Sequence, residues 1–435
     1  MKDTNTRMPR LDRLPLGRKP RLLFIAYDFP PINSIGCVRA YNIAKWLTRK
    51  GWEVTVVTPF ESAWRQGSSA DDLHDNLSRQ GIRCMRTEHF WRSLLPLPSE
   101  RRNFSWALGG VSRRVAGFLG IEREAGWLQE AERACTGLMP DDVDIVLASG
   151  PPFGAFDVAR RVAARIGRPF IMDYRDLWTG NPHAKRPLSQ PKIEIEREIL
   201  SAAAAATGVS PSLGQSLREQ FGVFGQFHVI SNGFDPEEMA VVPKFEFGHP
   251  AIVYAGVFYP PKRTADPLMA ALALLEERDK GQTPWAFHYY GYQGDYVLET
   301  AAAHGVASRV INHGRVPRSE ALSAVRGASA AVVISSVFET ASLQDRGIVT
   351  GKVFEAIGLG TPLLVIAPEG SDLEGVLSVT GLGKRFAGPD IEGMERYLRD
   401  VLRGRTAADS RPDSYSWDCI VEELDRVLRE AARGA

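Results

Sequence analysis

Neither sign of charge dominates this sequence, because 53 lysines and arginines stand against 52 aspartates and glutamates in 435 residues. No global field would attract nucleic acid, and any anion must be bound locally. The four cysteines lie far apart and form no CxxC pattern, so neither a zinc site nor a disulfide framework is expected. No apolar run reaches the roughly 18 residues of a membrane-spanning helix. These absences predict a cytoplasmic protein without nucleic acid as a partner.

Common cofactor and nucleotide motifs are missing as well. The chain has neither a GxGxxG dinucleotide fingerprint nor a GxxxxGKS/T phosphate loop, which argues against NAD dehydrogenases and simple ATPases. The acidic triplet DVD, Asp142 to Asp144, imitates a metal-binding motif. It precedes an apolar run, however, and would lie at the wrong end of a strand for a ligand site. We therefore expect neither a metal nor another cofactor.

Short apolar runs that alternate with helical stretches are what the sequence does contain. One series of β-rich runs falls between residues 21 and 235, and a second extends from "AIVYAG" to "PLLVIAP". Such alternation is typical of parallel sheets built from βαβ units, so we predict an α/β protein with two Rossmann-like, doubly wound domains facing a central cleft. The predicted ranges are a disordered basic leader (1–20), an N-terminal domain (21–235), a C-terminal domain (236–405) and a final segment (406–435) whose helix packs back on the N-terminal domain.

Residues that follow strands are the candidates for a site, because ligands of open parallel sheets gather beyond the carboxyl ends of the strands. Gly36, after the first strand, would let a helix start close to a phosphate, although it could equally serve a tight turn. Asp173 and Asp176 follow the fifth strand, where a carboxylate can orient a hydroxyl or take a proton. A local network of ion pairs with Arg175 is an equal alternative for these two aspartates.

Charged residues also follow strands in the second half. Lys262 and Arg263 come after "VYAG" and before a helix, a position in which two cations suit a diphosphate. The helix predicted from Gly351 should end at Gly358 and Gly360. Val353, Phe354 and Ile357 form its apolar packing side, which leaves Lys352 and Glu355 toward the cleft. A carboxylate there can accept hydrogen bonds from two neighbouring sugar hydroxyls. The alternative is an acid that only favours the helix dipole.

The stretch from Phe90 to Leu128 interrupts the alternation by mixing tryptophans with arginines. One interpretation is an amphipathic basic helix that brings the protein to a membrane surface or to a lipid-linked substrate. The other is a helical hairpin that packs on the first sheet and leaves its arginines in water. The first interpretation predicts a peripheral contact with the inner face of the cytoplasmic membrane.

Taken together, several segments resemble the family 4 glycosyltransferases, which are retaining, nucleotide-sugar-dependent enzymes of the two-domain GT-B fold. The resemblance implies that the nucleotide binds mainly to the second domain and the acceptor to the first. It extends in order from about Arg21 to Leu373. The segments that carry it are "FIAYDFPPINSIGCVRAYNIAKWLTRKGWEVTVVT", "ISNGFD", "YAGVFYPPKR", "HGRVPRSEAL" and "TGKVFEAIGLGTPLLVIAPEGSDL".

The resemblance also implies roles for individual residues. Glu355 matches the carboxylate that holds the ribose hydroxyls, and the basic pair at 262–263 matches the cations on the donor diphosphate. Gly36 matches the first-domain loop that closes on the phosphate. Arg315 and Val316, in "HGRVP", lie where the base usually rests.

Two positions depart from the family pattern. The family has a second glutamate eight residues before Glu355, and this chain has Gly347 there. A donor-sugar contact is therefore missing or comes from elsewhere, such as Glu339 or Lys352. The histidine that often follows the fourth strand is absent from "SGPPFGAF". Polar help near the reacting carbon must then come from the aspartates of "DYRDLW" or from a backbone carbonyl.

The residues and the resemblance together predict a retaining glycosyltransferase. It would move a sugar from a nucleotide diphosphate sugar to a hydroxyl of a sugar or lipid-linked acceptor, in surface polysaccharide or glycolipid assembly. Two alternatives remain. A sugar-nucleotide epimerase of similar fold would need acid–base carboxylates and histidines in the cleft, and a catalytically inactive nucleotide-sugar-binding scaffold would tolerate the missing glutamate and histidine.

Overall fold

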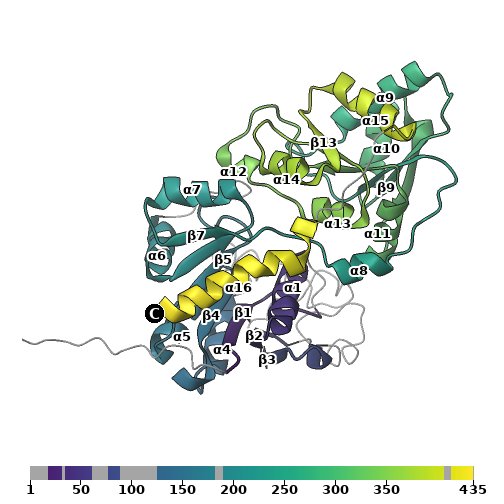
Figure 1. Cartoon of the computed structure of the whole chain (residues 1–435). Coiled ribbons are helices and arrows are strands. Elements are labelled where there is room, and N and C mark those ends of the chain that lie inside the picture. The colour runs from purple at the N-terminus through teal and green to yellow at the C-terminus, as the bar shows by residue number, and fades with distance from the viewer. Residues whose placement is uncertain are drawn as a thin grey trace, which may run out of the picture.

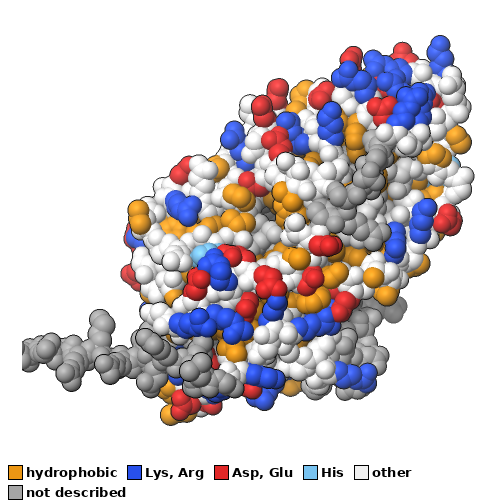
Figure 2. Space-filling model, in the orientation of Figure 1, with side chains coloured by type: hydrophobic (Ala, Val, Ile, Leu, Met, Phe, Trp, Pro, Cys, Tyr) orange, Lys and Arg blue, Asp and Glu red, His pale blue; other side chains and the backbone are white. Residues whose placement is uncertain are grey.

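Two parallel sheets, one in each half of the chain, form the framework of the molecule, and helices flank both sheets (Figure 1). The computed structural model describes residues 18–31, 35–60, 77–88, 125–181, 190–405 and 413–434. This arrangement confirms the predicted α/β architecture with two Rossmann-like domains. Figure 2 shows basic and acidic side chains intermingled over the drawn face, in line with the balanced composition.

The elements of the two domains have the following bounds. The first sheet contains β1 (Arg21–Ala26), β2 (Glu53–Pro59), β3 (Arg83–Thr87), β4 (Ile145–Gly150), β5 (Phe170–Tyr174), β6 (Ala205–Gly208) and β7 (Gln226–Val229). Its helices are α1 (Ile35–Arg49), α4 (Ala125–Ala134), α5 (Gly154–Ile166), α6 (Gln190–Ala202) and α7 (Pro211–Phe221). The second sheet contains β8 (Ala251–Ala255), β9 (Ala286–Tyr290), β10 (Val310–Gly314), β11 (Ala330–Ile334), β12 (Leu363–Ile366) and β13 (Gly383–Phe386). Its helices are α8 (Pro236–Val241), α9 (Asp266–Asp279), α10 (Gly294–Ala303), α11 (Arg318–Gly327), α12 (Leu343–Arg346), α13 (Gly351–Leu359), α14 (Asp372–Thr380) and α15 (Ile391–Leu402), and α16 (Trp417–Gly434) ends the chain.

The strand order places a crevice in each domain. The first sheet runs β3-β2-β1-β4-β5-β6-β7 and the second runs β10-β9-β8-β11-β12-β13. In each sheet the direction of winding reverses beside the first strand, β1 or β8, so the loops that follow this strand and its neighbour diverge. Ligands of open parallel sheets bind at such reversal points. The fold therefore positions the loops after β1, β4, β8 and β11 for a site.

Strand β1 shows why the first sheet is buried on both faces. Leu23 and Ile25 enter the core that lies on the side of α5, whereas Leu22 and Phe24 enter the core on the side of α1. Successive residues of a strand point to opposite faces, so a continuous apolar run fits a strand that is covered on both sides.

Helix α16 packs on the first domain although it follows the second in sequence. Its Trp417, Val421 and Leu428 are buried in the same core as Ile43 and Leu47 of α1. Figure 1 shows this helix, in yellow, lying along the first domain. The chain therefore crosses between the domains twice.

The first crossing segment joins β7 to α8 (residues 230–235), and the second leads into α16 (residues 413–416 of the described chain). The two segments pair with each other. Phe234 N donates to Tyr415 O at 3.0 Å, and Trp417 N donates to Phe234 O at 2.9 Å. The first crossing is also tied to α1, because Lys45 and Asp235 form a buried ion pair. Both connections between the domains therefore lie side by side, and the first of them runs along α1.

Strand β13 was not predicted from the sequence, whereas every strand predicted from an apolar run is present among β1 to β12. Lys384 and Arg385 occupy half of its four residues. It lies at the edge of the second sheet, where it pairs only with β12 among the described strands. An edge strand needs less apolar character than a central one, so the apolar-run criterion misses it.

Most of the segment from Phe90 to Leu128 lies outside the described residues, as do residues 1–17 of the predicted leader, so the predictions for both remain predictions. Trp127, near the end of that segment, is fully buried in the first core, with its ring centroid 5.1 Å from that of Tyr27. This tryptophan is therefore not available to a membrane surface. None of the described helices has the length and apolar character needed to span a bilayer.

Candidate active site

A cavity of about 850 Å³ lies between the two domains, at the carboxyl ends of strands from both sheets. Its first-domain wall comes from the loops after β1, β4 and β5 and from α1, and its second-domain wall from the loops after β8, β9 and β10 and from α11 and α13. This volume falls within the about 300–1,000 Å³ of small-molecule sites. The predicted residues that line the cavity are Gly36, Asp176, Arg263, Arg315, Val316, Lys352 and Glu355.

The loop after β8 presents Arg263 to the cavity through a tight hairpin. Tyr259 and Arg263 exchange backbone hydrogen bonds of 2.9 and 3.0 Å, and the guanidinium lies over the Tyr259 ring, 5.3 Å from its centroid. Gln293 fixes the same loop through hydrogen bonds to the backbone N and O of Phe258. The buried Nε of Arg263 has no hydrogen-bond partner among the described residues. A rigidly held cation with a free donor is suited to an anionic ligand.

Lys352, in the first turn of α13, is a second cation in the cavity wall. Its ammonium lies 5.5 Å from the ring centroid of Tyr254 on β8. Burial lowers the pKa of Lys352 to about 8, with a further decrease from Arg263 and an opposing effect from Glu355. An anion bound here would stabilise the charged form.

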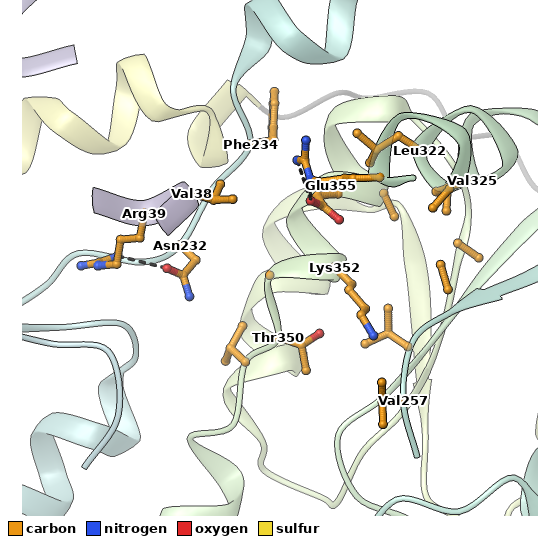
Figure 3. Close-up of a pocket in the computed structure, with 18 of the residues that line it drawn as sticks. Val38, Arg39, Asn232, Phe234, Val257, Leu322, Val325, Thr350, Lys352 and Glu355 are labelled. Carbon is orange, nitrogen blue, oxygen red and sulfur yellow. Dashed lines mark hydrogen bonds and ion pairs between the residues drawn. The ribbon is translucent and has the colours of Figure 1, made fainter. Parts of the chain in front are cut away.

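Glu355 lies one turn further along α13 and projects into the same cavity as Lys352 (Figure 3). Arg318, the first residue of α11, donates from Nη2 and Nε to Glu355 Oε1 at 2.7 and 3.2 Å. The same guanidinium pairs with Glu238 of α8. Although burial opposes the shift, the two carboxylates raise the pKa of Arg318. This cluster of Glu238, Arg318 and Glu355 is called the Arg318 bridge below.

A flat aromatic surface borders the cavity at the end of β9. Tyr290 stacks on His313 of β10, with ring centroids 4.2 Å apart and planes 2° from parallel. Burial, with Glu320 nearby, raises the pKa of Tyr290 to about 12, so its hydroxyl stays neutral. Val316 and Arg315 follow β10 and line the same cavity. Aromatic and apolar groups with few polar atoms suit a planar ring.

Asp173 lies beneath the cavity rather than in it, with 1% of its surface exposed. Arg39 donates to it from Nη2 and Nε at 2.6 and 3.1 Å, and the hydroxyls of Ser149 and Thr207 each donate at 2.8 Å. Although burial raises it, Arg39 and these hydrogen bonds hold the pKa of Asp173 below its usual range. Asp173 is therefore held in an ion pair, but its partner is the distant Arg39 and not the neighbouring Arg175 of the predicted local network. Of the two predicted aspartates only Asp176 lines the cavity.

Arg39 of α1 lines the cavity and was missed by the sequence analysis. Besides binding Asp173, it donates from Nη1 to Ser231 O at 3.0 Å and to Asn232 Oδ1 at 3.2 Å, the latter drawn in Figure 3. These two acceptors lead into the first crossing segment. Because Arg39 and Asp173 are 134 positions apart, spacing along the chain gives no signal of their pairing.

The surroundings of Gly36 are filled by another arginine. A Cβ at this position would lie 1.6 Å from Arg175 Nη1 and 2.4 Å from Asp28 Oδ2. Arg175 pairs with Asp28 at 2.9 Å and donates to Pro151 O. Glycine is therefore required at position 36 so that this guanidinium can cross the first turn of α1. Direct contact between Gly36 and a phosphate remains a prediction.

Lys262 does not line the cavity, unlike its neighbour Arg263. Its ammonium instead pairs with Asp345 of α12 at 2.7 Å. The structure thus separates the two adjacent cations, because the hairpin directs one side chain into the cavity and the other toward α12. Arg263 and Lys352, rather than Arg263 and Lys262, form the cationic pair of the site.

Gly347, at the position of the family's second glutamate, packs against the first domain. Ser210 Oγ donates to Gly347 O at 3.2 Å, and a Cβ at position 347 would lie 3.3 Å from the same hydroxyl oxygen. Glu339, one of the proposed replacements, is exposed and does not line the cavity, whereas Lys352 does.

Comparisons with known proteins agree with this geometry. Residues 37–233 match the model of the glycosyl transferase 4-like domain. Among solved structures, sucrose-phosphate synthase from Thermosynechococcus elongatus is 16% identical with a TM-score of 0.63, and the match covers 96% of this chain and 100% of that one. The lipopolysaccharide outer core galactosyltransferase WaaB is 13% identical with a TM-score of 0.57, over 94% and 99% of the two chains. HepE of Anabaena, in complex with UDP-glucose, is 14% identical with a TM-score of 0.57, also over 94% and 99%. No curated protein matches this sequence.

The two kinds of similarity cover different parts of the chain. The domain model accounts for the first domain from α1 to the first crossing segment. The solved structures show that both domains together have the GT-B fold, at identities too low to carry more than the fold. The chain is therefore a glycosyltransferase with the GT-B fold, and residues 37–233 of its first domain are similar to the glycosyl transferase 4-like domain.

Proposed function

We propose that this chain transfers a sugar from a nucleoside diphosphate sugar to an acceptor hydroxyl with retention of configuration at the anomeric carbon. The observation that carries the proposal is the grouping of Arg263, Lys352 and Glu355 in one interdomain cavity. Two cations suit a diphosphate. A carboxylate one helical turn after Lys352 on α13 suits the ribose hydroxyls of the same ligand. HepE was solved with UDP and with UDP-glucose, which makes UDP the first nucleotide to test.

In this mechanism the cations assist departure of the diphosphate. Negative charge grows on its terminal oxygen as the bond to the sugar breaks, and Arg263 and Lys352 stabilise that charge. The acceptor hydroxyl attacks from the face that the diphosphate leaves and gives its proton to a phosphate oxygen, so no protein base is required. Asp176, on the opposite wall, is the candidate that orients the acceptor hydroxyl. Because the chain supplies the cations, transfer should continue at an unchanged rate in excess EDTA.

The acceptor is proposed to be a sugar or a lipid-linked sugar at the cytoplasmic face of the membrane, in polysaccharide or glycolipid assembly. The match to a lipopolysaccharide galactosyltransferase supports this setting. Arg113 and Arg114, which lie outside the described residues, are the test of a membrane contact. Replacing both with glutamate should reduce co-sedimentation with anionic vesicles, because each cation near such a surface contributes about 1 kcal/mol. If the unmodified protein does not co-sediment with anionic vesicles, the membrane part of the proposal is wrong.

An epimerase of similar fold is the enzyme alternative, and the cavity gives it little support. Its chemistry would need histidines as well as carboxylates at the reacting carbon. No histidine is found among the described residues that line the cavity. His313 is near but stacks beneath Tyr290.

The central experiment is titration calorimetry with UDP, GDP and ADP, followed by transfer assays with sugars of the nucleotide that binds. Glu355→Gln should weaken nucleotide binding on the order of 10- to 100-fold without unfolding the protein, because loss of a charge-assisted hydrogen bond costs about 1.5–3 kcal/mol. Proton NMR of the product reports the anomeric configuration. Unchanged affinity in the glutamine variant would rule out the ribose role, and an inverted product would rule out retention.

A further inference from the structure

The Arg318 bridge joins three elements at the wall of the cavity. Arg318 begins α11, Glu355 lies in α13, and Glu238 lies in α8 directly after the first crossing segment. All three side chains line the cavity. Arg318 is 37% exposed and Glu355 is 27% exposed, so the cluster is neither buried nor fully in water.

The contacts within the Arg318 bridge engage only one of the two carboxylate oxygens of Glu355. Both hydrogen bonds from Arg318, at 2.7 Å from Nη2 and 3.2 Å from Nε, reach Oε1. No described residue donates a hydrogen bond to Oε2. One oxygen of the carboxylate is therefore held by the protein, and the other remains available to a ligand.

Arg318 uses four of its five N–H donors on carboxylates, which separates it from Arg263. Its Nη1 and Nη2 also contact the two oxygens of Glu238, so two carboxylates occupy one guanidinium. Five N–H donors on a planar fork can serve two carboxylates at once, but little then remains for a phosphate. Arg263, by contrast, keeps an unpartnered Nε. Contact with the diphosphate is thus assigned to Arg263, and Arg318 must act in another way.

Holding a glutamate in one rotamer has a direct effect on binding. A free glutamate side chain loses conformational entropy when it is ordered by a ligand. A side chain already fixed by its neighbours avoids that loss at the moment of binding. Binding of two adjacent hydroxyls depends strongly on this ordering, because both hydrogen bonds need the carboxylate in one orientation.

We infer that Arg318 is a positioning residue for the donor ribose: it holds Glu355 Oε1 so that Oε2 accepts hydrogen bonds from the ribose hydroxyls, with Glu238 as the second anchor. This inference rests on the proposed function. It predicts that Arg318 controls how strongly the protein distinguishes a ribose from a deoxyribose.

The test is calorimetry on the full chain with UDP, GDP and ADP and their 2′-deoxy forms. The unmodified protein should bind the ribonucleotide about tenfold more tightly than the deoxynucleotide, the effect expected for one lost hydrogen bond. Arg318→Gln should bring this ratio close to one, because Glu355 is no longer fixed. Arg318→Lys should restore part of it, since an ammonium can still hold one carboxylate.

Arg326→Gln is the matched control. Arg326 lies in the last turn of the same helix and donates to backbone oxygens of Met239, Ala240 and Val242, but it does not line the cavity. This variant should keep the full ribose preference. If Arg318→Gln proves too unstable to study, Glu238→Gln tests the bridge from its other side and should lower the ratio.

The outcomes separate this inference from the proposed function. If no nucleoside diphosphate binds the unmodified protein, the proposed function fails and the inference with it. If the ribonucleotide binds and is preferred, but Arg318→Gln weakens both forms equally and leaves the ratio unchanged, the positioning role is overturned while the proposed function stands.

Discussion

At the scale of single residues, the charge of Lys352 gives a prediction for the proposed donor binding. Its pKa of about 8 places the loss of the proton just above neutral pH. If the diphosphate binds only the ammonium form, the dissociation constant should be flat below pH 7 and rise about tenfold per unit above pH 8. Calorimetry with UDP from pH 6.5 to 9.5 measures this. Lys352→Met should bind weakly with a flat profile over the same range, and a flat profile in the unmodified protein would contradict the prediction.

The same lysine should reduce the stability of the ligand-free protein. An unfolded lysine has a pKa of about 10.4, whereas that of Lys352 is lowered by burial to about 8. Between these two pH values the unfolded chain binds more protons than the folded one, so the free energy of unfolding increases as pH rises from 8 to 10.4. Below pH 8 the buried charge of Lys352 lowers the free energy of unfolding by its full amount. Lys352→Met should therefore raise the melting temperature at pH 7, by an amount that shrinks toward pH 10. A gain that does not depend on pH would show that packing, not charge, is responsible.

At the scale of elements, helix α13 shows how far the sequence could be interpreted. Its start at Gly351, its end at Gly360 and its packing residues Val353, Phe354 and Ile357 agree with the prediction from periodicity. Gly358 was expected to help end the helix, but it lies inside it. Glycine is needed there because a Cβ would meet Phe234 of the first crossing segment, a contact that no local pattern could reveal.

Gly358 gives a prediction for this contact. A Cβ there would lie 2.5 Å from Phe234 Cγ and 2.8 Å from Met239 Cγ. Gly358→Ala should therefore destabilise the protein by about 1–3 kcal/mol despite the better helix propensity of alanine. Gly375→Ala, inside α14 where a Cβ meets nothing within 4 Å, is the control and should stabilise by about 0.5–1 kcal/mol. Urea denaturation measures both, and a gain at position 358 would refute the tight contact.

The site was predictable to the extent that its residues follow strands. Arg263 and Glu355 could be found because apolar runs reveal strand ends and helix faces. Arg39 and Arg318 could not, since each is defined by a carboxylate far away in sequence, at separations of 134 and 37 positions. Lys262 was predicted to lie in the site but does not line the cavity. The sequence could not distinguish it from the adjacent Arg263, because only the hairpin directs the two side chains to different places.

At the scale of the whole molecule, a contact between the domains lies at α7 and α14. Asp372 of α14 accepts hydrogen bonds from Ser212 N at 3.0 Å and Ser212 Oγ at 2.8 Å. Nearby, Ser210 of the first domain bonds Gly347 of the second. Together with the paired crossing segments, these hydrogen bonds join the two domains.

Asp372→Ala should shift the protein toward an open arrangement, because two hydrogen bonds to a carboxylate are lost. Small-angle scattering should give a larger radius of gyration without nucleotide and recover the compact value with saturating UDP. Glu374→Ala is the matched control, since Glu374 pairs with Arg385 inside the second domain. An unchanged radius in the Asp372 variant would mean that this contact does not hold the domains closed.

The return of α16 to the first domain also sets the order in which the domains can mature during synthesis. The second domain is one continuous stretch that is synthesised before α16. The first domain starts earlier but cannot cover Ile43 and Leu47 until Trp417 and the rest of α16 arrive. The domain that is translated first is therefore the one completed last, and until then an apolar strip along α1 and β4 is open to chaperones.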